Sequence, residues 1–549
     1  MMEWAHYIVR RVVPLLACAA AGLPAFAAEQ SEPSAKPGVV AEIDELIRAG
    51  WADNEVVPSP GADDAEWLRR IYLDLLGHVP PVETTDAFLK EREPGKRAEM
   101  VDALLSDPDY VRNFTTIWTN ILLGRVTPER TSRTGMESFL RESLDANRPW
   151  NEIVYDMLTA EGHFEENGAV NFLLGQLQGN PRRDDYTVEA TARATRVLLG
   201  VQVQCTQCHD HPFNPWKQAQ FWEFDSFFRQ IARNNVRRVD EDSGEMVDDY
   251  SELVSRDFTG PVYYETRAAE MKASFPAYFG REIELKWDTD RRVEFAKLVC
   301  HDDPSRQLAQ AMVNRMWGHF FGFGFTKPVD DMGPHNPPSH PEVLQRLTDE
   351  FVASGHDVKQ LCRWICQTEA YSLTSRFNDK NKVDDPANGE VPLFSHMYVK
   401  TLTAEQLYDS LLVATGADRA GQSDADTVRR QRDQWLDEFL SIFGGADDQE
   451  PTVFAGSIPQ ALMLMNGDLV KRAVGAEPGS YLYEVMNDSR LRSDNQRIQR
   501  LYLAALGRMP THRELGLLGK FVRGHPDKRS AYQDLYWALL NSNEFIVNH

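Results

Sequence analysis

Two cysteines and two histidines lie close together in the stretch Cys205–Phe228, and their types and spacing could hold a prosthetic group or a metal ion. Cys205 and Cys208 are three positions apart and His209 follows at once, which is the C-x-x-C-H arrangement by which haem c is attached. In that arrangement the two thiols form thioethers with the haem vinyl groups, and the next imidazole binds the iron. The sequence therefore predicts a covalent haem site at Cys205, Cys208 and His209.

Other interpretations of the same residues remain open. Cys205, Cys208, His209 and His211 together offer thiolate and imidazole groups, the usual ligands of Zn²⁺. The cysteines could instead close a short disulfide or form a thioredoxin-like pair, although no βαβ pattern surrounds them. His211 separates the haem and metal hypotheses, because a second imidazole helps a metal site and is not required for haem attachment.

The motif is expected to lie in a short polar link between two helices. Thr187–Leu199 has apolar side chains at helical spacing and is followed by Gly200, a typical helix stop. After the motif, Asn214 is a suitable N-cap and Pro215 fits the first position of a helix that reaches Ile231. Aromatic side chains at helical spacing on this second helix would form either a wall beside a haem or ordinary core.

The composition is that of a globular protein with an acidic surface. The chain has 549 residues and a net charge of −24, and this length suggests two to four domains. The negative charge argues against nucleic acid or an anionic membrane surface as a partner, because both require clustered Lys and Arg.

The N-terminus has the pattern of an export signal. Arg10 and Arg11 precede the apolar run Val12–Phe26, which ends in small residues before the chain turns polar at Glu29. Residues 1–28 are therefore predicted to be a signal peptide, with a lipoprotein signal at Cys18 as the alternative. No later apolar run reaches the roughly 18 residues of a membrane span. We expect an extracytoplasmic protein, either periplasmic or secreted.

The cysteines outside the motif are not expected to form a disulfide framework. Without Cys18 the chain has an odd number of cysteines, which argues against complete pairing in an oxidising compartment. Cys362 and Cys366 share one face of a predicted helix, where disulfide geometry is poor. They are expected to be small buried side chains.

The order of helix and strand signals predicts a mainly α protein with two helical domains joined by a small β-containing segment. Residues 29–39 are expected to be a disordered lead and 40–235 a helical domain that carries the motif. Residues 236–290 contain the convincing strand signal, Val262–Tyr264, and are expected to be the β-containing linker. Residues 291–549 are expected to form the second helical domain.

Two similar segments lie near the ends of the chain. Ile71–Pro80 is echoed by Leu501–Pro510, about 430 residues later, and Lys96–Tyr110 is echoed by Lys528–Phe545. Copies so far apart cannot stack as consecutive units of a solenoid. They predict a duplicated helical module at the two ends.

The second half contains a Gly- and Pro-rich loop, Gly322–Pro338, that is a candidate surface for a glycan or a partner protein. Asp330, Asp331 and His335 lie in this loop, and His340 follows it. Ordinary turn and capping roles are the alternative. A capping box that starts at Ser339 is predicted to begin the next helix, and Asp357 and Thr403 are predicted to begin later helices in the same way.

A haem at the motif would have several candidate distal ligands. These are methionines and a histidine, the residue types that bind haem iron most often: Met312, Met316 and His319 on a predicted helix Ser305–Phe320, and Met463 and Met465 further on. Methionines at helical spacing are also typical of a core.

The chain resembles large secreted planctomycete proteins that pair two domains of unknown function. One domain is associated with planctomycete cytochrome c domains and the other is called a planctomycete secretion-type domain. The resemblance rests on these stretches: Arg70–Gly77 with Pro80, Cys205–Phe213, Val313–Gly322, Pro338–Glu342, and Pro459–Leu462 with Asn466. It implies a haem protein similar to proteins found beside sulfatases and other exported polysaccharide-processing proteins.

Two functions follow as hypotheses. The first is electron transfer or another redox role through haem c at Cys205, Cys208 and His209, with a redox partner. The second is a non-redox scaffold or glycan-binding protein in extracytoplasmic polysaccharide processing, stabilised by Zn²⁺ or a similar ion. A hydrolase is the weakest possibility, because the sequence has no H-E-x-x-H, G-x-S-x-G or Walker motif.

Overall fold

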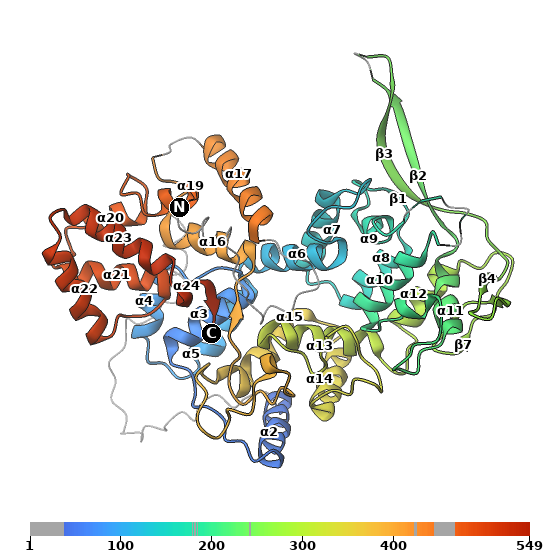
Figure 1. Ribbon diagram of the computed structural model, residues 1–549, viewed down its shortest axis with the longest axis horizontal. Helices are drawn as coiled ribbons and strands as arrows, with labels where there is room; N and C mark the ends of the chain where they lie inside the picture. Colours follow the sequence, from blue (N-terminus) through green and yellow to red (C-terminus); the bar gives the residue numbers. More distant parts are fainter. Residues whose placement is uncertain are drawn as a thin grey trace, which may run out of the picture. The chain divides into compact units, whose positions relative to one another are not determined.

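The computed structural model describes residues 38–549 except 178, 181–182, 184, 241–242, 422–424 and 444–466. The predicted signal peptide, most of the predicted lead and the stretch that holds Met463 and Met465 therefore lie outside the described residues. Within the described part the chain is mainly helical with a small antiparallel β segment, as predicted (Figure 1). No helix in that part is long and apolar enough to cross a membrane.

The helices before the motif follow the turn and capping signals of the sequence. Asp63 caps the helix that begins at Asp64, accepting the N–H groups of Ala65 and Glu66. Gly77, just beyond its end, has φ +79°, a conformation that glycine adopts without steric cost. The elements of this half are α2 (Gly38–Asp53), α3 (Asp64–Leu75), α4 (Val82–Lys90), α5 (Lys96–Leu105), α6 (Pro108–Leu123), α7 (Arg133–Asp145), α8 (Trp150–Thr159), η1 (Gly168–Val170), α9 (Asn171–Leu174) and α10 (Val188–Leu199).

The helix after the motif is shorter at both ends than predicted. It is α11 (Gln218–Phe228), which follows the short turn η2 (Gln204–Gln207). Asn214 does not cap it, because its side chain accepts the N–H of Trp216 (3.1 Å) and holds a local turn instead. At the other end Ile231 opens a strand. The prediction of a helix from Trp216 to Ile231 was therefore wrong at both ends.

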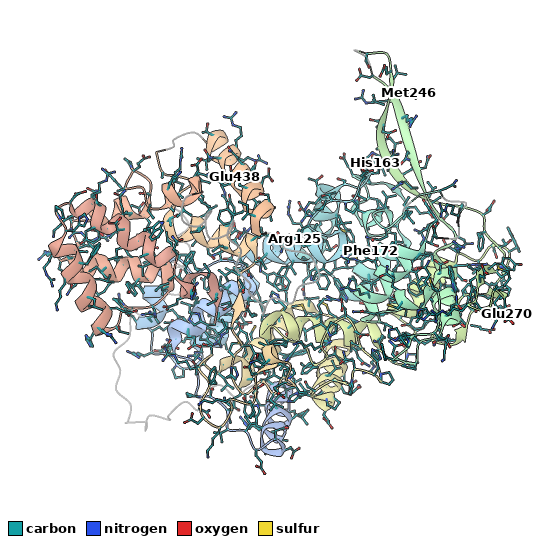
Figure 2. All side chains as sticks on the ribbon, viewed as in Figure 1. Arg125, His163, Phe172, Met246, Glu270 and Glu438 are labelled. Carbon is teal, nitrogen blue, oxygen red and sulfur yellow. The ribbon has the colours of Figure 1, made fainter. Side chains whose placement is uncertain are left out.

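The β segment consists of short antiparallel strands and one long hairpin. The strands are β1 (Gly162–His163), β2 (Ile231–Val239), β3 (Met246–Ser255), β4 (Val262–Glu265), β5 (Met271–Ser274), β6 (Ala277–Tyr278) and β7 (Arg281–Glu282). The first three form a sheet in the order β1-β3-β2, with a register irregularity after Val236. The β2–β3 hairpin extends away from the neighbouring helices, with Met246 toward its far end (Figures 1 and 2).

The second half is helical, with shaped loops between the helices. Asp357 and Thr403 cap their helices as predicted. Ser339 does not: the residue before the helix is His340, without a side-chain cap, because the Ser339 N–H is used by the carbonyl of Phe325 (2.8 Å). The elements are α12 (Arg291–Cys300), α13 (Gln307–Phe321), α14 (Pro341–Ala353), α15 (Val358–Gln367), η3 (Ala370–Ser372), η4 (Pro386–Asn388), β8 (Lys400–Thr401), α16 (Ala404–Thr415), α17 (Ala425–Phe443), α19 (Asp468–Ala473), α20 (Tyr481–Asn487), α21 (Asp494–Leu506), α22 (His512–Gly524), α23 (Lys528–Leu540), α24 (Asn543–Ile546) and β9 (Val547–Asn548).

The buried apolar side chains form two clusters, and α3 contributes to both. Ile71 and Leu75 belong to a cluster that extends along the chain to Tyr398. Leu73, between them in sequence, belongs to a second cluster that contains the C-terminal helices α21 to α24. Residues two apart on a helix point to different sides, so one short helix ties the N-terminal region to the C-terminal one.

The two similar segments of the sequence contact each other. Helices α3 to α6 and α21 to α24 occur in corresponding order. The guanidinium of Arg69 in α3 donates to the carbonyls of Ala505 (3.2 Å) and Phe545 (2.7 Å). Gly507 has φ +68°, as the corresponding Gly77 has +79°. The duplication itself remains an inference from the sequence.

Candidate functional site

The Cys-His motif lies in the link between α10 and α11, with its thiols at the surface. Cys205 is part of η2 and Cys208 ends it. Both cysteines are exposed and neither forms a disulfide. Thr206, between them, is fully buried and its hydroxyl donates to the carbonyl of Val203 (2.6 Å). The turn is therefore anchored by the residue between the cysteines, and both thiols stay accessible.

The start of α11 holds the backbone of the motif. The Gln207 carbonyl accepts the indole N–H of Trp222 (3.1 Å) and the side-chain amide of Gln218 (3.2 Å). The carboxylate of Asp210 accepts the backbone N–H of Gln218 (3.0 Å) and pairs with Lys217 (3.1 Å). The loop is thus fixed through its carbonyls and one carboxylate, without using the thiols.

The two histidines of the motif hold opposite tautomers. His209 Nδ1 lies 2.7 Å from the carbonyl of Asp210, and because a carbonyl only accepts, Nδ1 carries the proton and Nε2 has a free lone pair. His211 Nδ1 instead accepts the N–H groups of Phe213 (3.2 Å) and Asn214 (3.1 Å), so its proton is on Nε2 in the neutral ring. His209 presents a nitrogen that can bind a metal, in the manner typical of metal-binding histidines.

The zinc hypothesis finds no preformed cluster. Within the described residues, no group of three or more His, Cys, Asp or Glu side chains is arranged to hold a metal ion. His211 would have to release both backbone N–H groups before its Nδ1 could bind one. The four-ligand site of Cys205, Cys208, His209 and His211 therefore stays a prediction that requires a rearrangement.

The other cysteines and the distal-ligand candidates of the described part are used in packing. Cys300, Cys362 and Cys366 are buried and free, and for Cys362 and Cys366 this burial was expected. Burial raises the pKa of the Cys362 thiol to about 12. Met312 and Met316 belong to the buried core. His319 donates from Nε2 to the carbonyl of Asp74 (2.9 Å), and burial and the nearby Lys400 lower its pKa, which keeps it neutral.

The structure does not bring the four polar residues of the Gly/Pro loop into one site. Asp330 pairs with Arg196 (2.7 Å) and faces a cavity, while Asp331 pairs with His335 (2.9 Å). His340 is buried, and burial lowers its pKa to about 4. The loop and α13 do line a hollow of about 320 Å³, so the expected shaped surface exists without this set of side chains.

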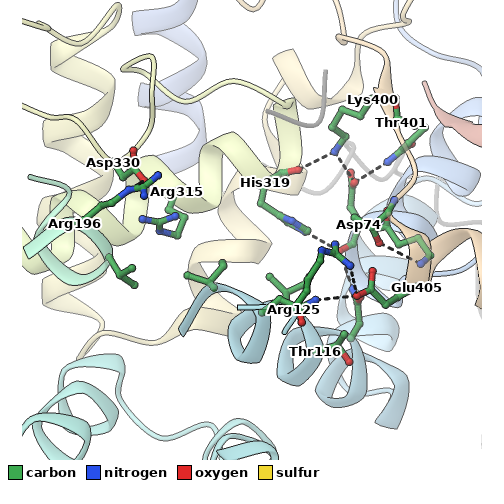
Figure 3. Close-up of a pocket in the computed structure, with 18 of the residues that line it drawn as sticks. Asp74, Thr116, Arg125, Arg196, Arg315, His319, Asp330, Lys400, Thr401 and Glu405 are labelled. Carbon is green, nitrogen blue, oxygen red and sulfur yellow. Dashed lines mark hydrogen bonds and ion pairs between the residues drawn. The ribbon is translucent and has the colours of Figure 1, made fainter. Parts of the chain in front are cut away.

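A second site, which sequence patterns did not predict, is a cavity of about 330 Å³ (Figure 3). Its wall comes from α3, α6, α10, α13 and the loop after it, the segment around β8, the start of α16, and Asn548 of β9. Five cationic side chains and three carboxylates line it, together with amides, hydroxyls and a few aliphatic groups. The charged lining residues are Arg125, Arg193, Arg196, Arg315, Lys400, Asp74, Asp330 and Glu405.

One end of the cavity is a hydrogen-bonded, charge-balanced network (Figure 3). Asp74, on α3, accepts from Lys400 Nζ, Tyr371 Oη and Asn548 Nδ2, each at 2.7 Å. Lys400 and Asp74 are both buried. The carboxylate of Glu405 pairs with Arg125 at 2.7 Å. This end joins the N-terminal helix α3 to the segment around β8 and to the C-terminus.

The other end is basic. Arg196, Arg193 and Arg315 line it with a single carboxylate, Asp330, within the described part. Figure 3 shows Arg196, Arg315 and Asp330 gathered there, away from the Asp74 end. Burial lowers the pKa of Arg315; Asp330 opposes that shift, and the neighbouring Arg196 and Arg193 add to it. Positive charge is therefore concentrated at this end of the cavity.

A local signal for this site exists in the sequence but is weak. Asn314 and Arg315 are two adjacent polar residues inside the stretch Val313–Phe321 of α13, which is otherwise apolar except for His319. The Asn314 side chain is buried and bonds Thr326 (2.8 Å), the Val329 carbonyl (2.9 Å) and the Phe325 N–H (2.7 Å). It holds the loop after α13 in place, whereas its neighbour Arg315 lines the cavity.

Comparison with known families finds two matches. PSCyt2, a protein of unknown function (DUF1549), matches residues 42–233, and PSD1, a protein of unknown function (DUF1553), matches residues 291–434. No curated protein and no solved structure matches the chain. The Cys-His motif lies in the first match, whereas the cavity is lined by side chains of both, for example Arg196 of the first and Arg315 of the second.

Proposed function

We propose that this chain, which belongs to the proteins that pair a PSCyt2 domain (DUF1549) with a PSD1 domain (DUF1553), carries a covalent c-type haem on Cys205 and Cys208. His209 is its axial ligand, and the protein acts in extracytoplasmic electron transfer. Export rests on the predicted signal peptide at residues 1–28 and on the secretion-type domain of the pair.

The observation that carries this proposal is the tautomer of His209. The bond from Nδ1 to the Asp210 carbonyl (2.7 Å) leaves Nε2 free to bind iron, and such a bond both orients a ligating imidazole and raises its basicity. The exposed thiols of Cys205 and Cys208 lie beside it in sequence and are not engaged in a disulfide. The residues present therefore fit the attachment of haem at the motif itself.

Haem bound here would supply one-electron transfer at the surface of the protein. The residues of the chain position it: the Gln207 carbonyl and the Asp210 carboxylate hold the loop on the start of α11. The exposed position of the motif suits approach by a redox partner. The described distal candidates Met312, Met316 and His319 are occupied elsewhere, so this proposal assigns no second axial ligand.

The test compares two matched histidine variants of the full chain, produced with the haem c maturation machinery. His209→Ala removes the proposed axial ligand, and His211→Ala removes a neighbouring imidazole whose Nδ1 only accepts two backbone N–H groups. We expect the wild type and His211→Ala to show the same c-type absorption bands. His209→Ala is expected to keep little or no bound haem or to show a shifted spectrum, because the iron loses its protein ligand.

The same samples are analysed for metals, which separates the alternative. Absence of haem from the wild type, together with one Zn²⁺ per chain that is lost in Cys208→Ser, would replace the redox proposal with the metal-stabilised scaffold. Identical spectra for wild type and His209→Ala would reject His209 as the ligand.

A further inference from the structure

The basic end of the cavity is lined by three arginines and, among the described residues, by one carboxylate. Arg193, Arg196 and Arg315 face Asp330 there, while the opposite end pairs Lys400 with Asp74 and Arg125 with Glu405. The whole chain has a net charge of −24, so this concentration of arginine is local and runs against the overall charge. Cavity walls of one sign of charge attract ligands of the opposite sign.

The guanidinium of Arg315 is available to bind a ligand. Its guanidinium makes no hydrogen bond and no ion pair with any described residue, although it lies beside Asp330 and two other arginines. Arg315 is partly buried, and a cation that is withdrawn from water is unfavourable unless it is paired and hydrogen-bonded. Asn314, the next residue on the same helix, is fully bonded within the protein, so the absence of partners is specific to the side chain that faces the cavity.

We propose that this cavity binds an organic oxyanion, with its sulfate, phosphate or carboxylate group held by Arg315 together with Arg193 and Arg196. The planar guanidinium offers paired N–H donors that match the oxygens of such groups. Arg196 already makes this kind of contact with Asp330 (2.7 Å), which places a charge-assisted bond at the edge of the same site.

The cavity is larger than an inorganic ion requires. Its volume of about 330 Å³ corresponds to roughly ten water molecules at about 30 Å³ each. Its lining also includes the aliphatic side chains of Ile117, Ile121 and Val197 and the polar side chains of Thr116 and Asn120. A ligand with an anionic group at one end and a hydroxyl-bearing body matches this lining, and it would bind independently of any haem at Cys205.

The experiment measures binding to the full chain by calorimetry at constant ionic strength, with chloride as the reference anion. The probes are inorganic sulfate, glucose 6-sulfate, glucose 6-phosphate and glucose. Two variants change the site: Arg315→Gln removes the cation, and Arg315→Lys keeps the charge but loses the paired N–H donors of the guanidinium. The control, Arg523→Gln, makes the same change in net charge as Arg315→Gln at an exposed position of α22.

We expect both sugar esters to bind more tightly than inorganic sulfate, and glucose not to bind. Arg315→Gln is expected to weaken ester binding by about tenfold or more, the size of a lost charge-assisted hydrogen bond, with an intermediate value for Arg315→Lys and no change for Arg523→Gln. Binding of neither ester, or equal binding by wild type and Arg315→Gln, would overturn the proposal. Equal affinities for sulfate and the esters would reject the organic body.

Discussion

The Cys-His motif and the basic cavity are two candidate sites that are assembled in opposite ways. The motif is conspicuous in the sequence, yet in the structure its cysteines are exposed and its loop is held by backbone contacts. The cavity has no recognisable motif, yet its side chains come from at least five segments and one end is a buried, hydrogen-bonded network. The residues of the motif are close because they are neighbours in the sequence, whereas those of the cavity are brought together by the fold.

This difference has a consequence for stability. A site that is made of neighbouring residues can lose its reactive side chains without disturbing the core, because few other groups depend on them. A site built from a buried network cannot, because each member satisfies charges or hydrogen bonds of the others. We therefore expect substitutions of the motif side chains to leave the stability of the fold almost unchanged. Substitutions in the buried network should lower the stability.

The strongest test of the comparison is Asp74→Asn. This change leaves Lys400 buried without its carboxylate partner and weakens the bonds from Tyr371 and Asn548. We expect the free energy of unfolding to fall by about 3–5 kcal/mol, the usual cost of breaking a buried ion pair. Denaturant unfolding measures it, with Asp379→Asn at an exposed ion pair as the control. An equal effect of the two substitutions would contradict the framework role of Asp74.

The second prediction concerns acid stability, because His340 is buried whereas the motif histidines are not. Burial lowers its pKa to about 4 from the ordinary value of 6.5. As the pH falls from 6.5 to 4, the unfolded chain therefore takes up a proton that the folded chain does not, and stability is lost. Between pH 7 and pH 5 we expect this residue to account for about 2 kcal/mol.

The variant His340→Phe should reduce that loss by the same amount, measured as the difference between denaturant unfolding at pH 7 and at pH 5. Phe325→Leu, a nearby core substitution without a titratable group, is the control and should shift the stability equally at both values. A pH dependence of His340→Phe identical to that of the wild type would show that His340 is not the group responsible.

The third prediction concerns the effect of Arg315, at the basic end of the cavity, on the stability of the fold. Arg315→Gln removes a cation that lies beside Arg193 and Arg196 without a hydrogen-bond partner in the described part. In the absence of multivalent anions we expect it to raise the free energy of unfolding by on the order of 1 kcal/mol, through relief of repulsion. Thermal unfolding in chloride buffer checks the sign; a clear loss of stability would indicate a structural role for Arg315.

The smallest effect is expected at the motif. Cys205→Ser with Cys208→Ser, in protein made without haem maturation, should change the free energy of unfolding by less than about 0.5 kcal/mol, as for other exposed positions. Denaturant unfolding is again the measurement, and Thr206→Ala, which removes the buried hydroxyl that bonds Val203, is the contrasting variant and should cost more. A larger loss for the double serine variant would mean that the thiols support the fold.

Local signals in the sequence predicted the parts of the fold that short-range physics determines. The caps at Asp357 and Thr403, the stop at Gly200 and the β segment after α11 are examples. The predicted N-cap at Asn214 was wrong because the side chain accepts the backbone N–H two residues later and so forms a local turn instead of a helix start. The predicted capping box at Ser339 was wrong, and the backbone N–H of Ser339 donates instead to the carbonyl of Phe325, fourteen positions earlier.

The motif could be identified from the sequence, but its geometry could not. Nothing in the order of residues shows that His209 and His211 hold opposite tautomers, since this depends on which backbone groups the folded loop brings to each ring. Apart from the weak signal at Asn314 and Arg315, the cavity could not be predicted. Arg196, Arg315 and Lys400 are more than 80 residues apart from one another in the chain and meet only through the packing of α10, α13 and β8.

The most direct test of haem attachment is the mass of the peptide that contains Cys205 and Cys208, taken from protein purified from the native cells. We expect this peptide to carry one haem through both sulfurs and neither thiol to react with an alkylating reagent. Recovery of the unmodified peptide, with both thiols open to alkylation or joined to each other, would contradict it.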